Sequence, residues 1–224
     1  MPLRPQLLAE LQAAIGNAMM PNLTVTSAGY DLFEAYVFGL VLQAARSEGA
    51  TVTFLDVHGN VPTIFTLRTS PGHIWSTAND YCHAVIDFPN CPLLESHVGV
   101  YVSGKSKVMH EIDVLVLYQQ EAEACRQNGV MPRNSEVVIG IECKFYSAAN
   151  LNIGLGRGFL GLCRDQQGSN YCFATNTTSS SLSKLLSYHK MKWRDRVTPN
   201  SSNDVTVFKS SLQTMFRNYR AKYE

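Results

Sequence analysis

Several features that would point directly to a function are missing from this chain. Its 224 residues include six cysteines, but no two of them are spaced C-x-x-C, so no zinc ribbon or dithiol redox motif is visible. The N-terminus has no basic region followed by a long apolar run. The longest apolar stretch, 35–45, contains Gly39 and Gln43 and is too short to span a bilayer. We therefore expect a cytoplasmic protein with reduced thiols and no membrane association.

Charge of either sign is also scarce. Charged residues make up 17% of the chain, and the formal net charge is +1, so the total charge does not indicate nucleic-acid binding. The distribution is uneven, because the segment from Ser180 onward holds nine Lys and Arg residues against three Asp and Glu residues. Its residues Lys190, Lys192 and Arg194 are candidate contacts to a phosphate backbone. An ordinary solvated surface explains the same residues, and both interpretations stay open.

Hydrophobic residues, at 45% of the chain, are sufficient to fill a core. Helical and strand periodicity predict an α/β fold, with a mixed central β-sheet flanked by helices, in a single domain over residues 1–224. Ser27 is the expected N-cap of the second helix, and Gly49 is its expected stop. We expect helices over 7–15, 30–46, 119–127, 150–164, 179–189 and 205–223, and strands over 52–57, 98–102, 108–118, 137–145 and 171–174. Short strands broken by proline predict a β-rich insertion at about 58–104.

Two of the predicted strands carry charged residues beside apolar runs. In the first, VMHEIDVLVL, Glu111 and Asp113 share one face because side chains alternate along a strand. In the second, VVIGIECKFY, Glu142 and Lys144 share a face in the same way. A carboxylate and an ammonium on an otherwise apolar strand are costly to bury without partners. An ordinary surface ion pair is the alternative, but the apolar run before Glu142 argues against an exposed strand.

A bound metal ion would satisfy these groups. Mg²⁺ prefers carboxylate oxygens and keeps several waters, so Asp113 and Glu142 are candidate ligands, with the backbone carbonyl of Cys143 as a third. The metal would lower the pKa of a bound water and stabilise charge on a scissile phosphate. Lys144 would orient that water or stabilise the developing charge. Glu111 is either a further ligand or a solvated carboxylate at the strand end.

The pattern of Asp113 followed by Glu142-Cys143-Lys144 on the next strong strand resembles the PD-(D/E)XK nuclease superfamily. The resemblance implies a restriction endonuclease-like core and Mg²⁺-dependent hydrolysis of phosphodiester bonds, with Mn²⁺ as a substitute. Glu34 resembles the helix glutamate that contacts the metal or its water in many members. Ile112 stands where the name-giving proline would be, and roughly 80 residues separate Glu34 from Asp113.

Other motifs are weaker. Gly104-Lys105-Ser106 lacks the upstream glycine and the following helix of a phosphate loop. Gly154 and Gly156 do not complete a dinucleotide-binding motif. The glycines around Arg157 and Arg164 could instead let a helix approach DNA, so that both arginines contact phosphates; solvent-facing arginines are the equal alternative.

Three hypotheses follow. The first is a Mg²⁺-dependent DNA endonuclease, with restriction or defence against foreign DNA as its setting and a homodimer as its cutting form. The second is a nuclease-like module that binds nucleic acid or protein without cutting. The third is a nuclease subunit that is active only within a larger complex. The intact set of Asp113, Glu142 and Lys144 favours the first.

Overall fold

A seven-stranded mixed β-sheet forms the centre of the computed structural model, which describes residues 3–146, 151–166 and 170–223. The strand order is β2-β4-β5-β6-β7-β8-β9; neighbours are antiparallel from β2 to β7 and parallel from β7 to β9. The strands of this sheet are β2 (Thr51–Asp56), β4 (Cys82–Asp87), β5 (Leu94–Ser103), β6 (Met109–Tyr118), β7 (Val137–Lys144), β8 (Tyr171–Thr175) and β9 (Lys192–Arg194). The expected α/β fold with a mixed sheet is confirmed.

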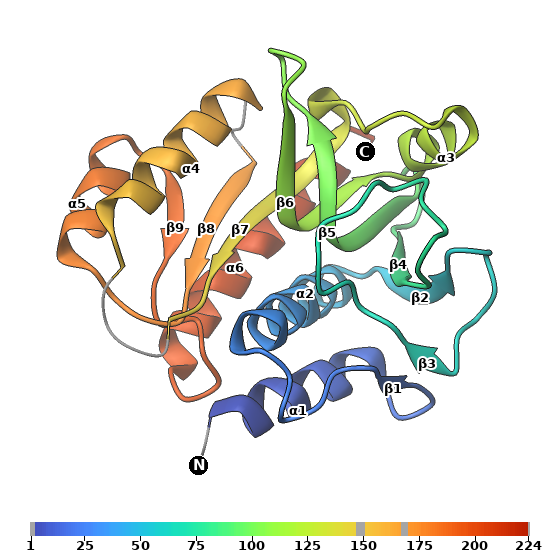
Figure 1. The fold of residues 1–224 in the computed structure, drawn as a ribbon, viewed down its shortest axis with the longest axis horizontal. Helices are drawn as coiled ribbons and strands as arrows, with labels where there is room; N and C mark the ends of the chain where they lie inside the picture. The colour runs from blue at the N-terminus through green and yellow to red at the C-terminus, as the bar shows by residue number, and fades with distance from the viewer. Residues whose placement is uncertain (1–2, 147–150, 167–169, 224) are drawn as a thin grey trace.

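Helices cover both faces of this sheet (Figure 1). Residues of α1, α2 and α6 share one buried cluster with Val114 and Ile141 of the central strands. Residues of α4 and α5 share a second cluster with Phe173, and Phe159 of α4 packs edge-on against that ring. The helices are α1 (Leu3–Ile15), α2 (Gly29–Ser47), α3 (Gln119–Asn128), α4 (Ile153–Asp165), α5 (Ser180–Tyr188) and α6 (Ser202–Arg220), with a short 3-10 turn at Asn134–Glu136.

Helix α2 is the most deeply buried helix, and its boundaries lie close to those expected. It ends before Gly49, whose φ of 92° suits glycine at this position. The expected N-cap is wrong, because the cap position is Ala28 and no side chain caps the helix. The hydroxyl of Ser27 instead accepts a hydrogen bond from the backbone N–H of Thr24 at 2.9 Å. Packing of the apolar face therefore holds the start of α2 in place of a cap.

The segment 58–104, expected to be β-rich, contributes strands to the main sheet. Its strands β4 and β5 are integral members of the main sheet, and β5 is the antiparallel partner of β6 along nearly its whole length. Only β3 (Ile64–Phe65) lies outside that sheet, in a small parallel pair with β1 (Met20–Pro21). Proline and turn residues break the segment locally, but the pairing of its strands with β2 and β6 spans distant parts of the sequence.

The C-terminal third differs from expectation in two places. Strand β9 was not expected, since three residues give too short a pattern to identify. Helix α6 starts at Ser202, before the expected start at residue 205. The expected start of α4 at Asn150 lies outside the described residues, and Asn152 caps the helix by accepting the N–H of Gly154 at 2.8 Å.

All six cysteines are free thiols. Within the residues that the structure describes, no helix combines the length and the apolar content that crossing a membrane requires.

Candidate active site

The candidate site begins where β6 and β7 separate. Their antiparallel pairing runs only as far as Val114 and Ile141, while β7 continues its pairing with β8 to Lys144. Beyond that point Asp113 Oδ2 accepts a hydrogen bond from the backbone N–H of Cys143 at 2.6 Å. The carboxylate of Asp113 therefore takes the place of a backbone acceptor and is itself only 5% exposed.

Lys144 joins the two predicted acidic ligands. Its Nζ lies 2.7 Å from Glu142 Oε1 and 3.3 Å from Asp113 Oδ2. Burial alone would lower the pKa of this ammonium, but the carboxylates of Asp113 and Glu142 raise it above its ordinary value. The lysine is therefore charged at neutral pH.

Glu34 is brought to the same place from α2. Burial, followed by the negative charges of Asp113 and Glu111, raises the pKa of Glu34 to about 9. Burial also raises the pKa of Asp113, although Lys144 and the N–H of Cys143 oppose this. Burial and then Asp113 raise the pKa of Glu142. These carboxyls resist ionisation because burial penalises their charged forms, and the ammonium of Lys144 offsets that penalty only in part.

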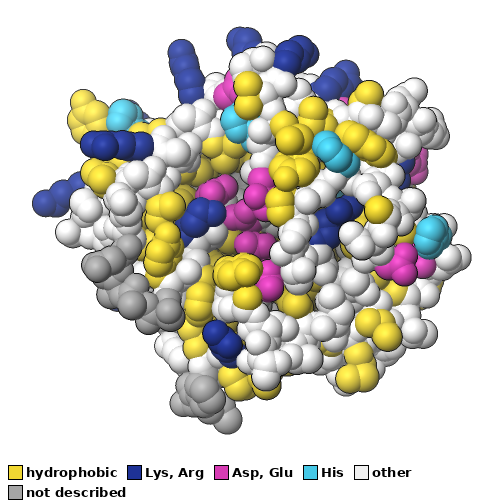
Figure 2. All heavy atoms as spheres, in the orientation of Figure 1, with side chains coloured by type: hydrophobic (Ala, Val, Ile, Leu, Met, Phe, Trp, Pro, Cys, Tyr) yellow, Lys and Arg dark blue, Asp and Glu magenta, His cyan; other side chains and the backbone are white. Residues whose placement is uncertain are grey.

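The start of α2 is docked against the end of β7. The rings of Phe33 and Phe145 lie 5.9 Å apart, and a Cβ added at Gly29 would lie 2.3 Å from the Phe145 ring. Glycine thus permits the close approach of α2 to β7. This approach places Glu34, the residue directly after Phe33, beside the carboxylates of the sheet. Figure 2 shows acidic side chains gathered in a hollow in the middle of the face, with a basic side chain at its edge.

One acidic neighbour was missed from the sequence. Asp31 lies one helical turn before Glu34, its charge raises the pKa of Glu34, and burial raises its own pKa. The spacing of three residues on one helix was the available signal. Glu111, whose role was left open, is exposed at the rim; partial burial and the charge of Asp113 raise its pKa.

The predicted nucleic-acid contacts are not all on the side of the carboxylates. In the parallel strands, Glu142 aligns with Phe173 and Trp193, whereas Cys143 aligns with Ala174 and Arg194. Arg194, and Lys192 two residues earlier, therefore project from the sheet face opposite Glu142 and Lys144. Lys190 is exposed in the turn before β9.

Arg157 and Arg164 are both exposed on α4, which covers the sheet face from which Glu142 and Lys144 project. They lie seven residues apart and so share one side of the helix. The last residue of α4, Asp165, holds the β5–β6 hairpin: its carboxylate accepts from Ser106 Oγ at 2.6 Å and lies 2.7 Å from His110 Nε2. His110, adjacent in sequence to the site, thus has a structural partner.

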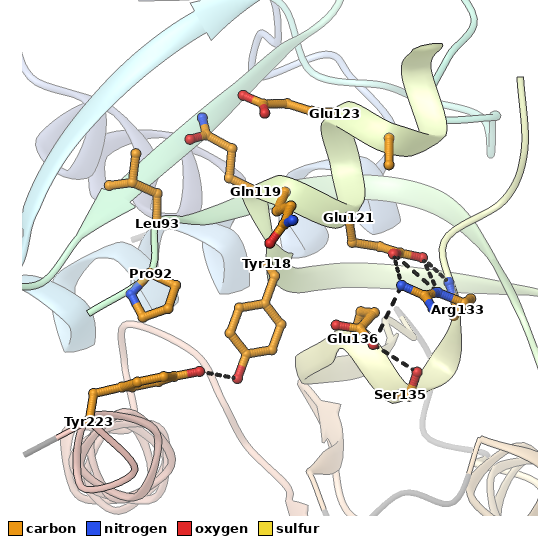
Figure 3. Close-up of a pocket in the computed structure, with 12 residues that line it drawn as sticks. Pro92, Leu93, Tyr118, Gln119, Glu121, Glu123, Arg133, Ser135, Glu136 and Tyr223 are labelled. Atoms are coloured by element: carbon orange, nitrogen blue, oxygen red, sulfur yellow. Dashed lines mark hydrogen bonds and ion pairs between the residues drawn. The ribbon is translucent and has the colours of Figure 1, made fainter. Parts of the chain in front are cut away.

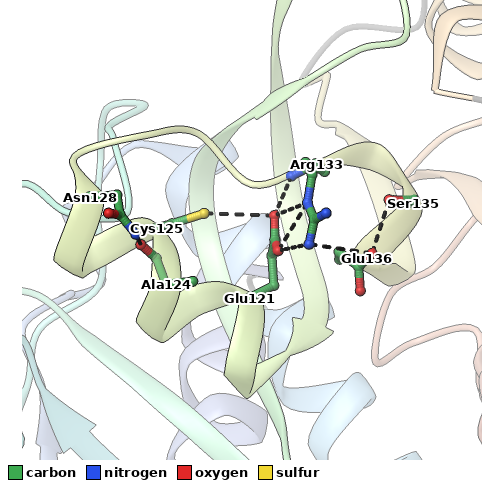
Figure 4. A network of polar contacts seen from close by, with 7 residues as sticks. All are labelled: Glu121, Ala124, Cys125, Asn128, Arg133, Ser135 and Glu136. Carbon is green, nitrogen blue, oxygen red and sulfur yellow. Dashed lines mark hydrogen bonds and ion pairs between the residues drawn. The ribbon is translucent and has the colours of Figure 1, made fainter.

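A separate cavity lies at the far end of β6. It has a volume of about 710 Å³ and is lined by Tyr118, Tyr223 and several acidic side chains, as Figure 3 shows. Arg133, the arginine that lines this cavity, already has a carboxylate partner. Its Nε and Nη2 donate hydrogen bonds to the buried carboxylate of Glu121 (Figure 4). This pair anchors the segment that leads into β7, and so fixes the start of the strand that carries Glu142 and Lys144.

In the described part of the chain, no three His, Cys, Asp or Glu side chains are already grouped as a metal-binding set. The donor set nevertheless fits a hard divalent cation in two respects. Asp113, Glu142 and Glu34 offer carboxylate oxygens, the type of ligand that Mg²⁺ prefers. Burial is the largest cause that raises the pKa of all three carboxyls, and a cation bound among them would favour their charged forms. No contact in the structure tests the carbonyl of Cys143 as a ligand.

Comparisons of the chain with protein-family models, with curated proteins and with solved structures found no match. The resemblance to the PD-(D/E)XK superfamily therefore depends on the residues of the site alone.

Proposed function

We propose that this protein is a Mg²⁺-dependent endonuclease that hydrolyses phosphodiester bonds in DNA. The observation that carries the proposal is the position of Lys144 Nζ between the carboxylates of Asp113 and Glu142, at 3.3 and 2.7 Å, in an acidic hollow with too little positive charge. A purely structural ion pair would need one carboxylate for one lysine. The additional, partly buried carboxyl of Glu34 has no such explanation.

Asp113, Glu142 and Glu34 would hold the metal. A divalent cation bound there supplies a Lewis acid that polarises the phosphodiester and activates water. Mn²⁺ is expected to substitute for Mg²⁺, because both accept carboxylate ligands.

Lys144 would stabilise charge on the substrate. Its ammonium stays protonated at neutral pH and can donate a hydrogen bond to a phosphate oxygen, where negative charge grows as the attacking oxygen approaches phosphorus. Glu142 keeps that ammonium in place. Glu34, with a pKa of about 9, carries a proton at neutral pH and can release it when positive charge enters the hollow.

Cleavage of supercoiled plasmid DNA tests the proposal. Wild-type protein with Mg²⁺ or Mn²⁺ should nick or linearise the plasmid, and Lys144→Ala and Asp113→Asn should reduce the rate at least about 100-fold, as loss of a charge-stabilising group does. Lys105→Ala, at the exposed hairpin tip, is the matched lysine control. Equal cleavage by all four proteins would refute the proposal, and binding without any cleavage would favour a nuclease-like binding module.

Double-strand cutting further suggests a homodimer, because one site cuts one strand. Sedimentation velocity with and without DNA tests this. A monomer under both conditions would contradict the homodimer and leave single-strand nicking, or activity within a larger complex.

A further inference from the structure

A second polar cavity, of about 560 Å³, lies between the segment that follows β3 and strand β5. Arg68 is its one basic residue apart from His73. Hydroxyl and amide side chains make up most of the remaining lining, which includes Thr66, Thr69, Ser70, Ser76, Asn79 and Tyr101. The volume is in the range of small-ligand sites.

Arg68 has no carboxylate partner among the ion pairs of the described residues. Its guanidinium carbon lies 3.6 Å from the centre of the Tyr81 ring, and Nη2 donates to the carbonyl of His73 at 3.0 Å. Its Nε is buried without a partner. Asp80, the one carboxylate of the lining, has a side chain that is 79% exposed and lies 3.6 Å from His58. A guanidinium that is held in place at the wall of a cavity and has no carboxylate partner is suited to an anion such as phosphate.

Aromatic rings stand beside this arginine. The ring of His73 stacks on Trp75, with centroids 4.1 Å apart and planes 20° apart, and lies 5.3 Å from the ring of Tyr101. His73 Nδ1 is also buried without a partner. Flat rings next to a cation are the combination that binds unpaired bases and the backbone of a single strand.

The cavity is connected to the candidate active site through β5. Tyr101 is the cross-strand partner of Glu111, at the rim of the acidic hollow. Gly99 lies between the pairs Val98–Val114 and Val100–Ile112, and therefore opposite Asp113. A Cβ added at Gly99 would lie 3.6 Å from the Cβ of Arg68. One strand spacing, about 5 Å, thus separates the strand that carries Asp113 from the strand against which Arg68 packs.

We infer that this cavity is a nucleotide subsite, which binds a phosphate of a nucleic-acid strand on Arg68 and one unpaired base against the His73 and Tyr101 rings. The inference rests on the proposed function for its choice of ligand, and it makes that function more specific. The preferred substrate has an unpaired nucleotide beside the cut, as in single-stranded, frayed or flap DNA.

Binding measured without divalent metal tests the subsite separately from cleavage. A fluorescein-labelled single-stranded 12-mer is titrated with the full chain in EDTA at several salt concentrations, and fluorescence anisotropy is recorded. Arg68→Gln should weaken binding about 10-fold and reduce the slope of log K against log salt by about 0.7, the value for one lost phosphate contact on a single strand. His73→Leu should weaken binding about 10-fold with the slope unchanged, because stacking carries no charge.

Three comparisons complete the design. Arg68→Lys should keep the salt slope, and Lys222→Gln removes an exposed positive charge outside the cavity and should bind as wild type does. A DNA duplex closed at both ends by non-nucleotide linkers has no unpaired bases. Wild type should bind it more weakly than the 12-mer, and His73→Leu should affect that binding less. Circular dichroism melting checks folding, and if Arg68→Gln does not fold, His73→Leu and Arg68→Lys decide the question.

The outcomes separate the two proposals. Wild-type affinity and slope in folded Arg68→Gln and His73→Leu, or no binding of the 12-mer by wild type, would overturn the subsite. If wild type cleaves DNA and the variants bind the 12-mer as wild type does, the proposed nuclease function is retained and the subsite is rejected. If binding depends on Arg68 but the protein never cleaves DNA, the subsite is retained and the nuclease function is rejected.

Discussion

Asp113 and Cys143, thirty residues apart in sequence, are joined by a 2.6 Å hydrogen bond from the backbone N–H of Cys143 to Asp113 Oδ2. The bond forms where β6 stops pairing with β7, so Asp113 both satisfies a buried backbone donor and presents its carboxylate to Lys144. One residue thus has a structural and a proposed catalytic role. Two different substitutions of Asp113 can separate its structural role from its proposed catalytic role.

Asp113→Asn and Asp113→Ala should therefore differ in stability while both lose cleavage. Asparagine keeps an oxygen that can accept the Cys143 N–H, whereas alanine leaves that donor buried and unpaired, at a cost of about 1–3 kcal/mol. Urea unfolding at pH 7 measures the difference. An alanine variant as stable as the asparagine variant would show that the hydrogen bond does not support the fold.

Glu34→Gln should stabilise the protein at alkaline pH. Burial and the charges of Asp113 and Glu111 raise the pKa of Glu34 from 4.5 to about 9. Between these values the folded state holds a proton that the unfolded state has released, so stability falls as pH rises from 4.5 towards 9. Glutamine cannot ionise, so the gain should be near zero at pH 4.5 and should grow by about 1.4 kcal/mol for each pH unit, to at most about 5 kcal/mol at pH 8.

Urea unfolding of wild type and Glu34→Gln across that pH range provides the measurement. Parallel curves for the two proteins would argue against a shifted Glu34. If Glu34 also serves the proposed metal, the variant should show a smaller increase in melting temperature on addition of Mg²⁺ or Mn²⁺ than wild type does.

A second buried group should make the protein sensitive to acid. Glu95 is fully buried, receives both ends of the Arg126 guanidinium at 2.9 and 2.6 Å, and lies 2.9 Å from His97 Nε2. The ring of His83 stacks on that of His97 at 4.9 Å. Burial would raise the pKa of Glu95, but the hydrogen bonds from His97 and Arg126 bring it below its ordinary value. Burial lowers the pKa of His83 to about 3 and also lowers that of His97.

The lowered pKa values of the two histidines and of Glu95 all make the folded protein less stable as pH falls. The unfolded histidines take up protons below pH 6.5 while the folded ones do not, so stability falls as pH drops from 6.5 towards 3. The contribution of Glu95 is lost only at lower pH, as the folded carboxylate is protonated. His83→Leu should reduce the fall in stability between pH 7 and pH 5. It should not lose a hydrogen bond, because neither ring nitrogen of His83 makes one to a described residue, although Nε2 lies 3.7 Å from Glu95 Oε2. Equal urea midpoints for wild type and variant at both pH values would contradict this origin of acid sensitivity.

Gly29→Ala should disturb the site without touching a carboxylate. The added Cβ would lie 2.3 Å from the Phe145 ring, so either the ring or the start of α2 must move, at a cost of about 1–3 kcal/mol. Plasmid cleavage should fall as Glu34 shifts from the sheet. Gly29→Ala combined with Phe145→Leu should recover much of the loss, whereas a double variant no better than the single one would indicate another cause.

The local sequence pattern was sufficient to predict several helices and strands and to place half of the residues of the candidate site. The apolar run of α2 and its final glycine predict the helix, and strand alternation places Glu142 and Lys144 on one face, because both properties depend on residues a few positions apart. The pattern did not identify β9, the N-cap of α2, the start of α6, or the membership of β4 and β5 in the main sheet. Those features depend on partners distant in sequence, such as the pairing of β5 with β6.

The sequence alone determined which side chains share a strand face, since alternation is a property of the extended backbone itself. Only the tertiary structure decided which strands separate at Asp113, that Glu34 reaches the same hollow from α2, and that Arg194 lies on the opposite face of the sheet. It also placed Arg68 and Tyr101 one strand away from the carboxylates. Contacts between distant segments are fixed by how the two apolar clusters pack around the sheet, and no local spacing encodes that packing.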